Sequence, residues 1–344
     1  MKIVADVDIP FLEGVFEPYA EVTYKKGVDI TREDVSDADA LIVRTRTQCD
    51  AALLGGSKVR IVASATIGTD HIDKDYCRSC GIEVANASGC NAGGVMQYVF
   101  SAVYGIAARK GIKLDDVTFG VVGVGNVGKR VAEMAESLGF KVMRCDPPRA
   151  EKEGPEGFCS LEELLEQSQV VTLHTPLDET TRGLADDAFF TMMLPGTIFI
   201  NAARGEVVDE KALMKAIPKL GAVVLDTWNN EPDVDEELVE LVDIATPHIA
   251  GYSYQGKING TTMAVRAVAR CLGIDALEDF SPEDADEDHQ PVRLDLRGRN
   301  HGEIAAVLQY NYPIFTDDFR FRMEPHKFEK LRNEYQYRRE IVLE

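Results

Sequence analysis

The chain has 344 residues, of which 45% are hydrophobic, and its formal net charge is −21 at pH 7. This length allows two or three domains with separate cores, and the strong negative charge argues against nucleic acid and anionic membrane surfaces as partners. No apolar run approaches the roughly 20 residues of a membrane-spanning helix, and the N-terminus lacks a signal-peptide pattern, so we expect a cytoplasmic protein that binds no membrane.

Five short apolar runs in the first hundred residues predict β-strands, and two longer patterns predict helices. The helix expected over residues 71–81 ends at Gly81, and a second helix is expected over 95–111. The expected strands cover residues 2–7, 21–25, 40–45, 59–65 and 82–87.

A second series of strands follows, with helices between its members. One of these helices, over residues 160–168, opens with Ser160 and Glu163, which form a capping box. Strands that alternate with helices indicate βαβ units, so we predict an α/β protein with two Rossmann-like, doubly wound parallel-sheet domains. The second series of strands covers residues 118–125, 141–146, 170–176, 197–203 and 222–228.

The pattern changes near residue 279, where an acidic stretch with prolines, "EDFSPEDADEDHQP", predicts a linker. The remaining fifty or so residues form a small α+β segment that is short for independent folding. We expect it to pack on the main body or on a partner subunit.

Seven scattered cysteines do not predict a disulfide framework in a cytoplasmic chain of this size. Cys77 and Cys80 have C-x-x-C spacing, but no second pair of ligands at similar spacing follows. We therefore interpret them as two thiols one helical turn apart and expect no metal site.

The motif G-x-G-x-x-G, formed by Gly123, Gly125 and Gly128, lies between a predicted strand and a predicted helix. A second strand follows and ends at Asp146. In this context the glycines permit a tight turn and close approach of backbone to a pyrophosphate at a helix N-terminus. Asp146 favours NAD over NADP because a carboxylate accepts hydrogen bonds from a ribose hydroxyl and repels a 2′-phosphate. We assign the intervening Asn126 and Val127 to the same NAD site.

Polar residues follow three strands beyond this motif. Arg204 follows the strand over 197–203, Asp226 and then Glu231 follow the next strand, and His248 follows the apolar run 242–246. Arginine binds carboxylates through two hydrogen bonds, histidine transfers protons near neutral pH, and a carboxylate orients the imidazole. Each residue alone could be an ion-pair partner, a turn residue or a buried histidine. Together, after a dinucleotide motif, they indicate oxidation of a hydroxy acid by hydride transfer.

These residues lie in stretches that resemble the D-2-hydroxyacid dehydrogenase family: "ATIGTDHID", "GVGNVG", "HTPL", "NAARGEVVDEKAL", "LDTWNNEP" and "TPHIAG". The resemblance implies that Arg204 binds the substrate, Glu231 orients the acid/base and His248 donates or accepts the proton. It also implies a discontinuous substrate domain (residues 1–95 and 253–278), an NAD domain (96–252), and a linker and dimerisation domain (279–344).

Within the family, the chain is most similar to members that act on a small phosphorylated hydroxy acid and form homodimers through an appended C-terminal segment. On this resemblance, the further residues that contact NAD are Thr175, Asp226 and Gly251, and the residues that contact substrate are Thr45, Thr66 and Tyr252. Alternatives are another D-2-hydroxy acid, such as 3-phosphoglycerate or a lactate-like acid, and an NAD-sensing binding protein related to corepressors.

A phosphorylated substrate needs cations besides Arg204. Arg44 and Arg46 flank Thr45 at the end of an N-terminal strand, and in a strand side chains two apart share a face. Arg338 and Arg339 form a second candidate pair, which a dimer could place near the partner's active site.

Overall fold

The computed structural model describes residues 1–282 and 289–344. Two compact units are present, one formed by Met1–Asn91 with Ser253–Gln290 and the other by Ala92–Tyr252 with Pro291–Glu344. The sequence places the first boundary four residues later and treats residues 279–344 as a separate part. In the structure, residues 291–344 pack within the second unit, and residues 283–288 of the expected linker lie outside the described residues.

The first unit contains a five-stranded parallel sheet with strand order β2-β1-β3-β4-β5. Alternate strand residues are buried on opposite faces: Ile3 packs toward Val265 of α11 (Tyr254–Leu272), whereas Val4 packs toward Leu53 of α2 (Ala51–Leu54). All five predicted strands are confirmed, with ends one or two residues shorter in most cases: β1 Lys2–Asp6, β2 Glu21–Lys25, β3 Ala40–Val43, β4 Ile61–Ser64 and β5 Glu83–Asn86.

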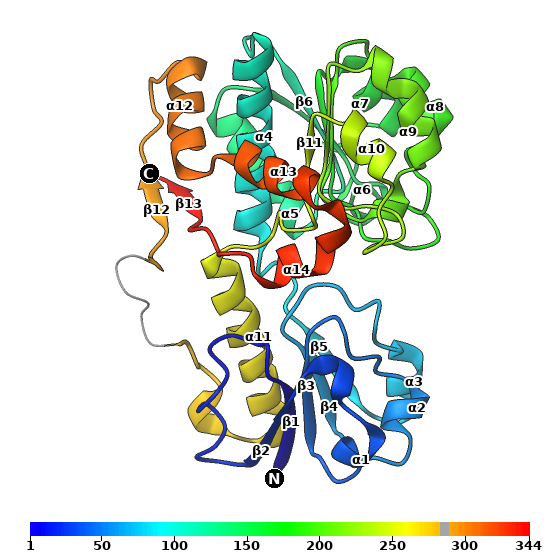
Figure 1. Ribbon diagram of the computed structural model, residues 1–344, viewed down its shortest axis with the longest axis vertical. Coiled ribbons are helices and arrows are strands. Elements are labelled where there is room, and N and C mark those ends of the chain that lie inside the picture. The colour runs from blue at the N-terminus through cyan, green and yellow to red at the C-terminus, as the bar shows by residue number, and fades with distance from the viewer. Residues whose placement is uncertain (283–288) are drawn as a thin grey trace. The chain divides into compact units, whose positions relative to one another are not determined.

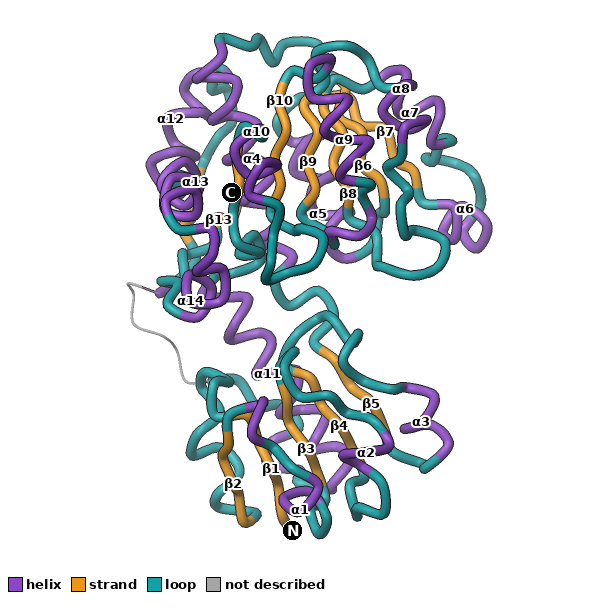
Figure 2. The backbone as a smooth tube through the Cα atoms, turned by 45° about the vertical axis from the view of Figure 1, so that its right-hand side comes forward, coloured by secondary structure: helices purple, strands orange, loops and turns teal. Residues whose placement is uncertain are grey.

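The second unit contains a six-stranded parallel sheet with order β11-β10-β9-β8-β6-β7. The strands from β10 to β7 can be followed in Figure 2. The order reverses at β6, which pairs with both β7 and β8. Ligands of open α/β sheets bind beyond the carboxyl ends of strands at such a reversal. The strands are β6 Thr118–Val122, β7 Lys141–Cys145, β8 Val170–Leu173, β9 Ile198–Asn201, β10 Ala222–Leu225 and β11 Ile244–Ala245.

Helices cover both faces of this sheet, which is why its strands read as nearly continuous apolar runs. One face packs on α4 (Ala92–Lys110) and α5 (Asn126–Ser137), and the other packs on α7 (Leu161–Gln167), α8 (Asp187–Met192), α9 (Glu210–Ala216) and α10 (Glu236–Leu241). The predicted capping box of Ser160 and Glu163 is present at the start of α7. The shorter helices are α1 Arg32–Val35, α3 Lys74–Ser79, α6 Pro147–Glu153, η1 Gly27–Asp29, η2 Gly205–Val207, η3 Ile217–Lys219, η4 Asp275–Leu277 and η6 Pro325–Lys327.

The C-terminal segment, residues 291–344, adds α12 (His301–Asn311), α13 (Ile314–Met323), α14 (Phe328–Asn333) and a parallel pair of strands, β12 (Val292–Leu294) and β13 (Ile341–Leu343). In Figure 1, where it is orange to red, α12 packs along α4, and α13 packs on α4 and the edge strand β11. Asp318 of α13 is buried and accepts the backbone N–H of Ala245, 2.7 Å away. The segment therefore covers an edge of the sheet that would otherwise be open.

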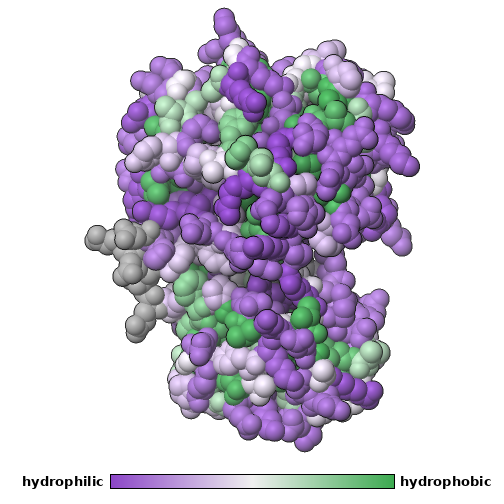
Figure 3. Space-filling model, viewed as in Figure 1, coloured by the Kyte–Doolittle hydropathy of each residue, from purple (hydrophilic) through white to green (hydrophobic). Residues whose placement is uncertain are grey.

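The distribution of apolar residues can be compared with what the sequence predicts. Most of the face in Figure 3 is hydrophilic, with small scattered apolar patches, as the composition leads one to expect. Among the described residues, no helix is long and apolar enough to cross a membrane.

Candidate active site

The catalytic candidates come from three neighbouring strands of the second sheet. β9, β10 and β11 are parallel and adjacent, so their carboxyl ends lie at one edge. Arg204 follows β9, Asp226 begins the loop after β10, and His248 lies three residues beyond β11. The fold thus brings the loops that carry these residues to the same edge, as the sequence predicts.

His248 and Glu231 form a direct pair, with 2.7 Å between the imidazole Nδ1 and the carboxylate Oε2. The other carboxylate oxygen of Glu231 accepts the backbone N–H of Trp228 at 2.9 Å. An ionised carboxylate only accepts hydrogen bonds, so Nδ1 carries a proton, and in the neutral ring Nε2 then presents its lone pair. This tautomer is the one that a general base requires.

The charge state of Glu231 follows from its surroundings. Burial by itself raises the pKa of the carboxyl group, but the charge on His248 and the hydrogen bonds from His248 and Trp228 outweigh it, with a smaller contribution from Arg332. The resulting pKa of Glu231 is below its ordinary value of 4.5. Glu231 is therefore a carboxylate at neutral pH and stabilises an imidazolium on His248.

Trp228, the only tryptophan of the chain, connects the three loops. Its indole Nε1–H donates to the carbonyl of Thr246 at 2.9 Å, just before His248. Gly205, next to Arg204, lies so close to Trp228 that an added Cβ would be 2.0 Å from its carbonyl carbon. Any larger residue at position 205 would push the arginine loop away from the Glu231 loop.

The backbone at His248 has an unusual conformation that its neighbours maintain. His248 has φ of +56°, in the left-handed region that few residues other than glycine adopt. The buried Asp226 carboxylate accepts the next two backbone N–H groups, those of Ile249 at 2.8 Å and Ala250 at 2.9 Å. It also accepts the hydroxyl of Thr246 at 2.7 Å. Asp226 thus holds the loop on both sides of the imidazole.

Arg204 is half-buried just beyond β9, and one guanidinium nitrogen donates to the carbonyl of Ala203 at 2.8 Å. Asn201, the last residue of β9, fixes this turn by donating to the Arg204 carbonyl and accepting from the Ala203 N–H. The planar guanidinium of Arg204 offers five donors in total, which suits it to bind a carboxylate.

The glycine motif has the geometry that a dinucleotide site needs. Gly123 has φ of +82°, and a Cβ on Gly128 would be 1.9 Å from the Gly123 carbonyl, so only glycine permits this contact. Gly125 caps α5 without a side-chain hydrogen bond, and a Cβ there would meet nothing within 4 Å. The N-terminus of α5, with Asn126 and Val127 in its first turn, is therefore open to an anion.

Asp146 lies at the end of β7, as predicted. One of its oxygens accepts the N–H of Val124 at 2.7 Å, and the other accepts the N–H of Arg149 at 3.1 Å. The guanidinium of Arg149 is held by two hydrogen bonds to Glu153 and one to the Val124 carbonyl. Arg149 is thereby held between its own helix and the glycine turn, and Glu153 compensates its charge.

Thr175 provides a further indication of a ligand in this region. Its hydroxyl oxygen is buried and has no hydrogen-bond partner among the described residues. It lies just after β8, on the opposite side of β6 from Asp146, where the strand order reverses. The open glycine turn, the Asp146 carboxylate and this hydroxyl fit a dinucleotide across the reversal point.

The expected substrate residues fall in both units. Arg44 and Thr45 follow β3 and Thr66 follows β4, two adjacent strands of the first unit. β3 ends at Val43, so Arg44 and Arg46 lie beyond the strand, and strand alternation does not determine where their side chains point. In the second unit, Tyr252 packs against Tyr335 and Tyr337, with the Arg332 guanidinium 5.8 Å above its ring, and Gly251 precedes it.

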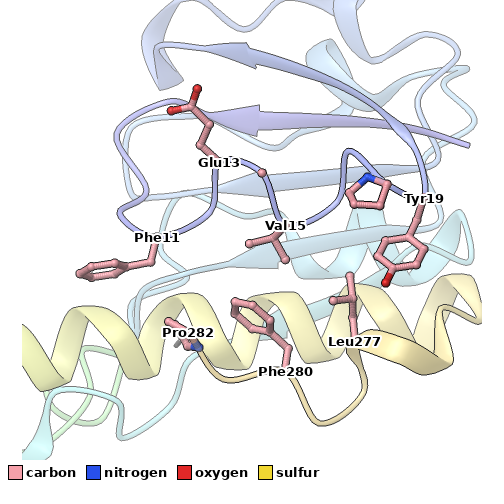
Figure 4. Close-up of a pocket in the computed structure, with 9 residues that line it drawn as sticks. Phe11, Glu13, Val15, Tyr19, Leu277, Phe280 and Pro282 are labelled. Carbon is pink, nitrogen blue, oxygen red and sulfur yellow. The ribbon is translucent and has the colours of Figure 1, made fainter. Parts of the chain in front are cut away.

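A separate hollow in the first unit, of about 560 Å³, is lined by Phe11, Val15, Tyr19 and Phe280 among others (Figure 4). It contains none of the predicted site residues, so we do not assign it to the active site.

Arg338 is not where a phosphate-binding role requires it. Both of its terminal nitrogens are buried and donate to carbonyl groups of its own chain, those of Gly94, Ile249, Ala250 and Tyr252. The hypothesis that Arg338 binds substrate phosphate is therefore wrong. Arg339 is half-buried, and its role stays a hypothesis.

Sequence reasoning missed the residues that support the site from a distance. Thr246 and Trp228 lie within the matching stretches "TPHIAG" and "LDTWNNEP", which assign them no role, and Arg332 lies outside all of these stretches. Thr246 could have been found from the sequence, because it is a polar residue only two positions before the predicted catalytic residue His248. No local pattern reveals Arg332, because its position relative to Glu231 depends on how the C-terminal segment packs.

Comparison with known proteins agrees with this geometry. The model of the D-isomer specific 2-hydroxyacid dehydrogenase NAD-binding domain matches residues 99–250. An erythronate-4-phosphate dehydrogenase of Bacteroides fragilis is 42% identical over 347 residues, which cover 99% of this chain and 97% of that protein. The chain belongs to the D-isomer specific 2-hydroxyacid dehydrogenase family. It is an NAD-dependent dehydrogenase, and the predicted fold class and cofactor are confirmed.

Other members of the family show how far the similarity extends. A protein of the same name from Ectopseudomonas mendocina is 41% identical over 99% of this chain and 93% of its own length. An NAD⁺-bound 3-phosphoglycerate dehydrogenase from Entamoeba histolytica is 30% identical, with a TM-score of 0.66 over 83% of this chain and 99% of that chain. A D-lactate dehydrogenase from Aquifex aeolicus, complexed with NAD and lactic acid, is 25% identical, with a TM-score of 0.67 over 83% of this chain and 100% of that chain.

Proposed function

We propose that this dehydrogenase oxidises 4-phospho-D-erythronate to (R)-3-hydroxy-2-oxo-4-phosphooxybutanoate, a step of pyridoxal 5′-phosphate biosynthesis. The name of its relatives supports this substrate, since they align with almost the whole chain, including the C-terminal segment. We further propose a cytoplasmic homodimer in which the first unit binds substrate and residues 92–252 bind NAD.

The site residues divide the reaction among them. Arg204 binds the substrate carboxylate and fixes C2. His248 Nε2 accepts the proton of the 2-hydroxyl group as the C2–H bond breaks, and Glu231 stabilises the imidazolium that forms. When bound, NAD accepts the hydride that leaves C2. The substrate loses one hydride and one proton, so the 2-oxo acid is formed and His248 later releases its proton to solvent.

The contact that carries this proposal is the 2.7 Å hydrogen bond between His248 and Glu231. It fixes the imidazole in the tautomer that accepts a proton at Nε2, beside the loop of a carboxylate-binding arginine. A merely structural histidine at this position would need neither the ionised partner nor the left-handed backbone.

The experiment measures NADH formation with purified protein and four acids: 4-phospho-D-erythronate, D-erythronate, D-lactate and 3-phosphoglycerate. We expect the phosphorylated erythronate to give the highest kcat/KM. His248→Gln should lower kcat by about 10²–10⁴-fold, the usual value of general-base catalysis, while ADP-ribose still binds.

Two outcomes would contradict parts of the proposal separately. A higher kcat/KM for another acid removes the substrate assignment but leaves the dehydrogenase. Near-normal kcat in His248→Gln shows that another group takes the proton.

A further inference from the structure

Arg338 lies on the C-terminal segment, yet its guanidinium contacts the loop that follows His248. Nη1 donates to the carbonyl groups of Ile249 and Tyr252, both at 3.2 Å, and Nη2 donates to the carbonyl of Ala250. Nη2 also reaches the Gly94 carbonyl at the start of α4, 3.0 Å away. One side chain thus joins the catalytic loop to the helix beneath it.

The Arg338 side chain is itself firmly held. Its guanidinium lies 4.2 Å above the ring of Tyr312, and Nη1 also contacts the Tyr335 hydroxyl at 3.1 Å. The next residue but one, Glu340, is buried against Gly93, where an added Cβ would be 2.0 Å from its carboxylate. Gly93 therefore leaves the space that the Glu340 side chain fills.

Arg338 and Asp226 act on the backbone of the same two residues, and both bind the peptide group between Ile249 and Ala250. Asp226 accepts the N–H groups of Ile249 and Ala250, and Arg338 donates to their carbonyl groups. The backbone N–H and carbonyl groups of these two residues are thereby all satisfied, and the Ile249 carbonyl also accepts the N–H of Tyr252 at 2.8 Å. A buried backbone group left without a partner would destabilise this conformation.

The conformation that they hold includes the strained residue of the site. A non-glycine residue in the left-handed region persists only when its surroundings determine it strongly. His248 directly precedes Ile249, whose N–H binds Asp226 and whose carbonyl binds Arg338, so a loose loop would let the imidazole turn away from Glu231.

We infer that Arg338 is a positioning residue of the active site, through which the C-terminal segment fixes the His248 imidazole against Glu231. Arg338 does not touch the reacting atoms. It acts through the loop, and the inference rests on the proposed role of His248.

The test compares Arg338→Lys with Arg297→Lys, a matched control whose arginine is exposed on the same segment and pairs with Asp295. Lysine keeps the charge but has one nitrogen, so it cannot reach carbonyls on both sides. We expect kcat with 4-phospho-D-erythronate to fall about tenfold to hundredfold, the order expected for a displacement near 1 Å. ADP-ribose affinity and cooperative unfolding should change little, and Arg297→Lys should match wild type.

A second readout needs no substrate. The Nδ1–H proton of His248, hydrogen-bonded to a carboxylate, gives a shifted NMR signal in ¹⁵N-histidine protein, and His248→Gln assigns it among only six histidines. We expect this signal to broaden or disappear in Arg338→Lys and to persist in Arg297→Lys.

The outcomes separate the two proposals. Normal kcat together with a normal His248 signal in Arg338→Lys overturns the positioning role. If wild type does not oxidise 4-phospho-D-erythronate, the substrate proposal fails, and the NMR comparison still decides the role of Arg338. If Arg338→Lys does not fold, Tyr335→Phe, which removes one partner of the guanidinium, should broaden the signal and lower kcat several-fold. An unchanged signal and kcat in Tyr335→Phe would then overturn the inference.

Discussion

The proposed role of Arg204 in binding the substrate carboxylate can be tested with a single substitution. If its guanidinium binds the substrate carboxylate through two hydrogen bonds, Arg204→Lys keeps the charge and loses the paired geometry. Hydrogen bonds to charged groups contribute about 1.5–3 kcal/mol, so kcat/KM for the hydroxy acid should fall about tenfold to 150-fold. Steady-state kinetics measures this, with ADP-ribose affinity as the control. Unchanged kinetics would place the carboxylate elsewhere.

The preference for NAD over NADP should depend on Asp146 and on Glu153, which binds the Arg149 guanidinium through two hydrogen bonds. Asp146→Ser keeps a helix-capping oxygen and removes the charge that opposes a 2′-phosphate. The ratio of kcat/KM for NADP to that for NAD should rise by about tenfold or more, equivalent to 1.4 kcal/mol.

Adding Glu153→Gln to this variant should raise the ratio further, because it releases the Arg149 guanidinium from its bidentate partner. Glu153→Gln alone serves as the control. If the double variant equals Asp146→Ser, Arg149 does not reach the phosphate.

At the residue level, the sequence predicts where the polar side chains follow the strands, and the structure places Glu231 and His248 in contact. The sequence does not predict the residues that hold the loop of His248 in place. The carbonyl groups that Arg338 contacts lie 86 to 244 positions away in the chain. Such a pairing follows from tertiary packing, and no local pattern of charge or hydropathy contains it.

At the level of elements, the end of β8 couples stability to pH. Burial lowers the pKa of His174, just beyond this strand, to about 3. The folded state therefore keeps the ring neutral, whereas the unfolded chain binds a proton below pH 6.5, the ordinary value. Stability is unaffected above that pH and falls as the pH decreases from 6.5 toward 3, by at most ~1.4 kcal/mol per pH unit.

His174→Gln removes the group responsible for this loss of stability at acidic pH. The unfolding free energy of the variant minus that of the wild type should therefore increase as the pH decreases below 6.5. Urea unfolding at pH 7.5, 6.5 and 5.5, followed by the fluorescence of Trp228 in the same unit, measures it. His326→Gln is the control. A difference that does not change with pH would show that His174 protonates freely in the folded state.

The ends of elements were harder to predict than their existence. The apolar run 242–246 contains a strand of only two residues, Ile244–Ala245, because the backbone turns toward His248 while its side chains remain buried. Helix α4 begins at Ala92, three residues before its apolar pattern, through two glycines with poor helix propensity. Packing against the distant tail stabilises that first turn.

At the level of the whole molecule, the alternation of strands and helices predicts two parallel sheets, because each crossover must cover a face. The position of residues 291–344 could not be read from the same pattern. The three short helices and two short strands of this segment show no repeating pattern from which their packing partners could be predicted. Their place within the second unit depends on contacts such as Asp318 with the Ala245 N–H.

The distance in sequence between Arg338 and the catalytic loop also imposes an order on synthesis. A ribosome completes the glycine motif, both sheets and His248 well before residue 338, which is 88 positions after Ala250. Local βαβ units can fold as they emerge, whereas this contact closes late because it joins distant parts of the chain. A nascent chain can thus acquire its dinucleotide-binding turn early, yet the loop that carries His248 gains this support only after residue 338 has been synthesised.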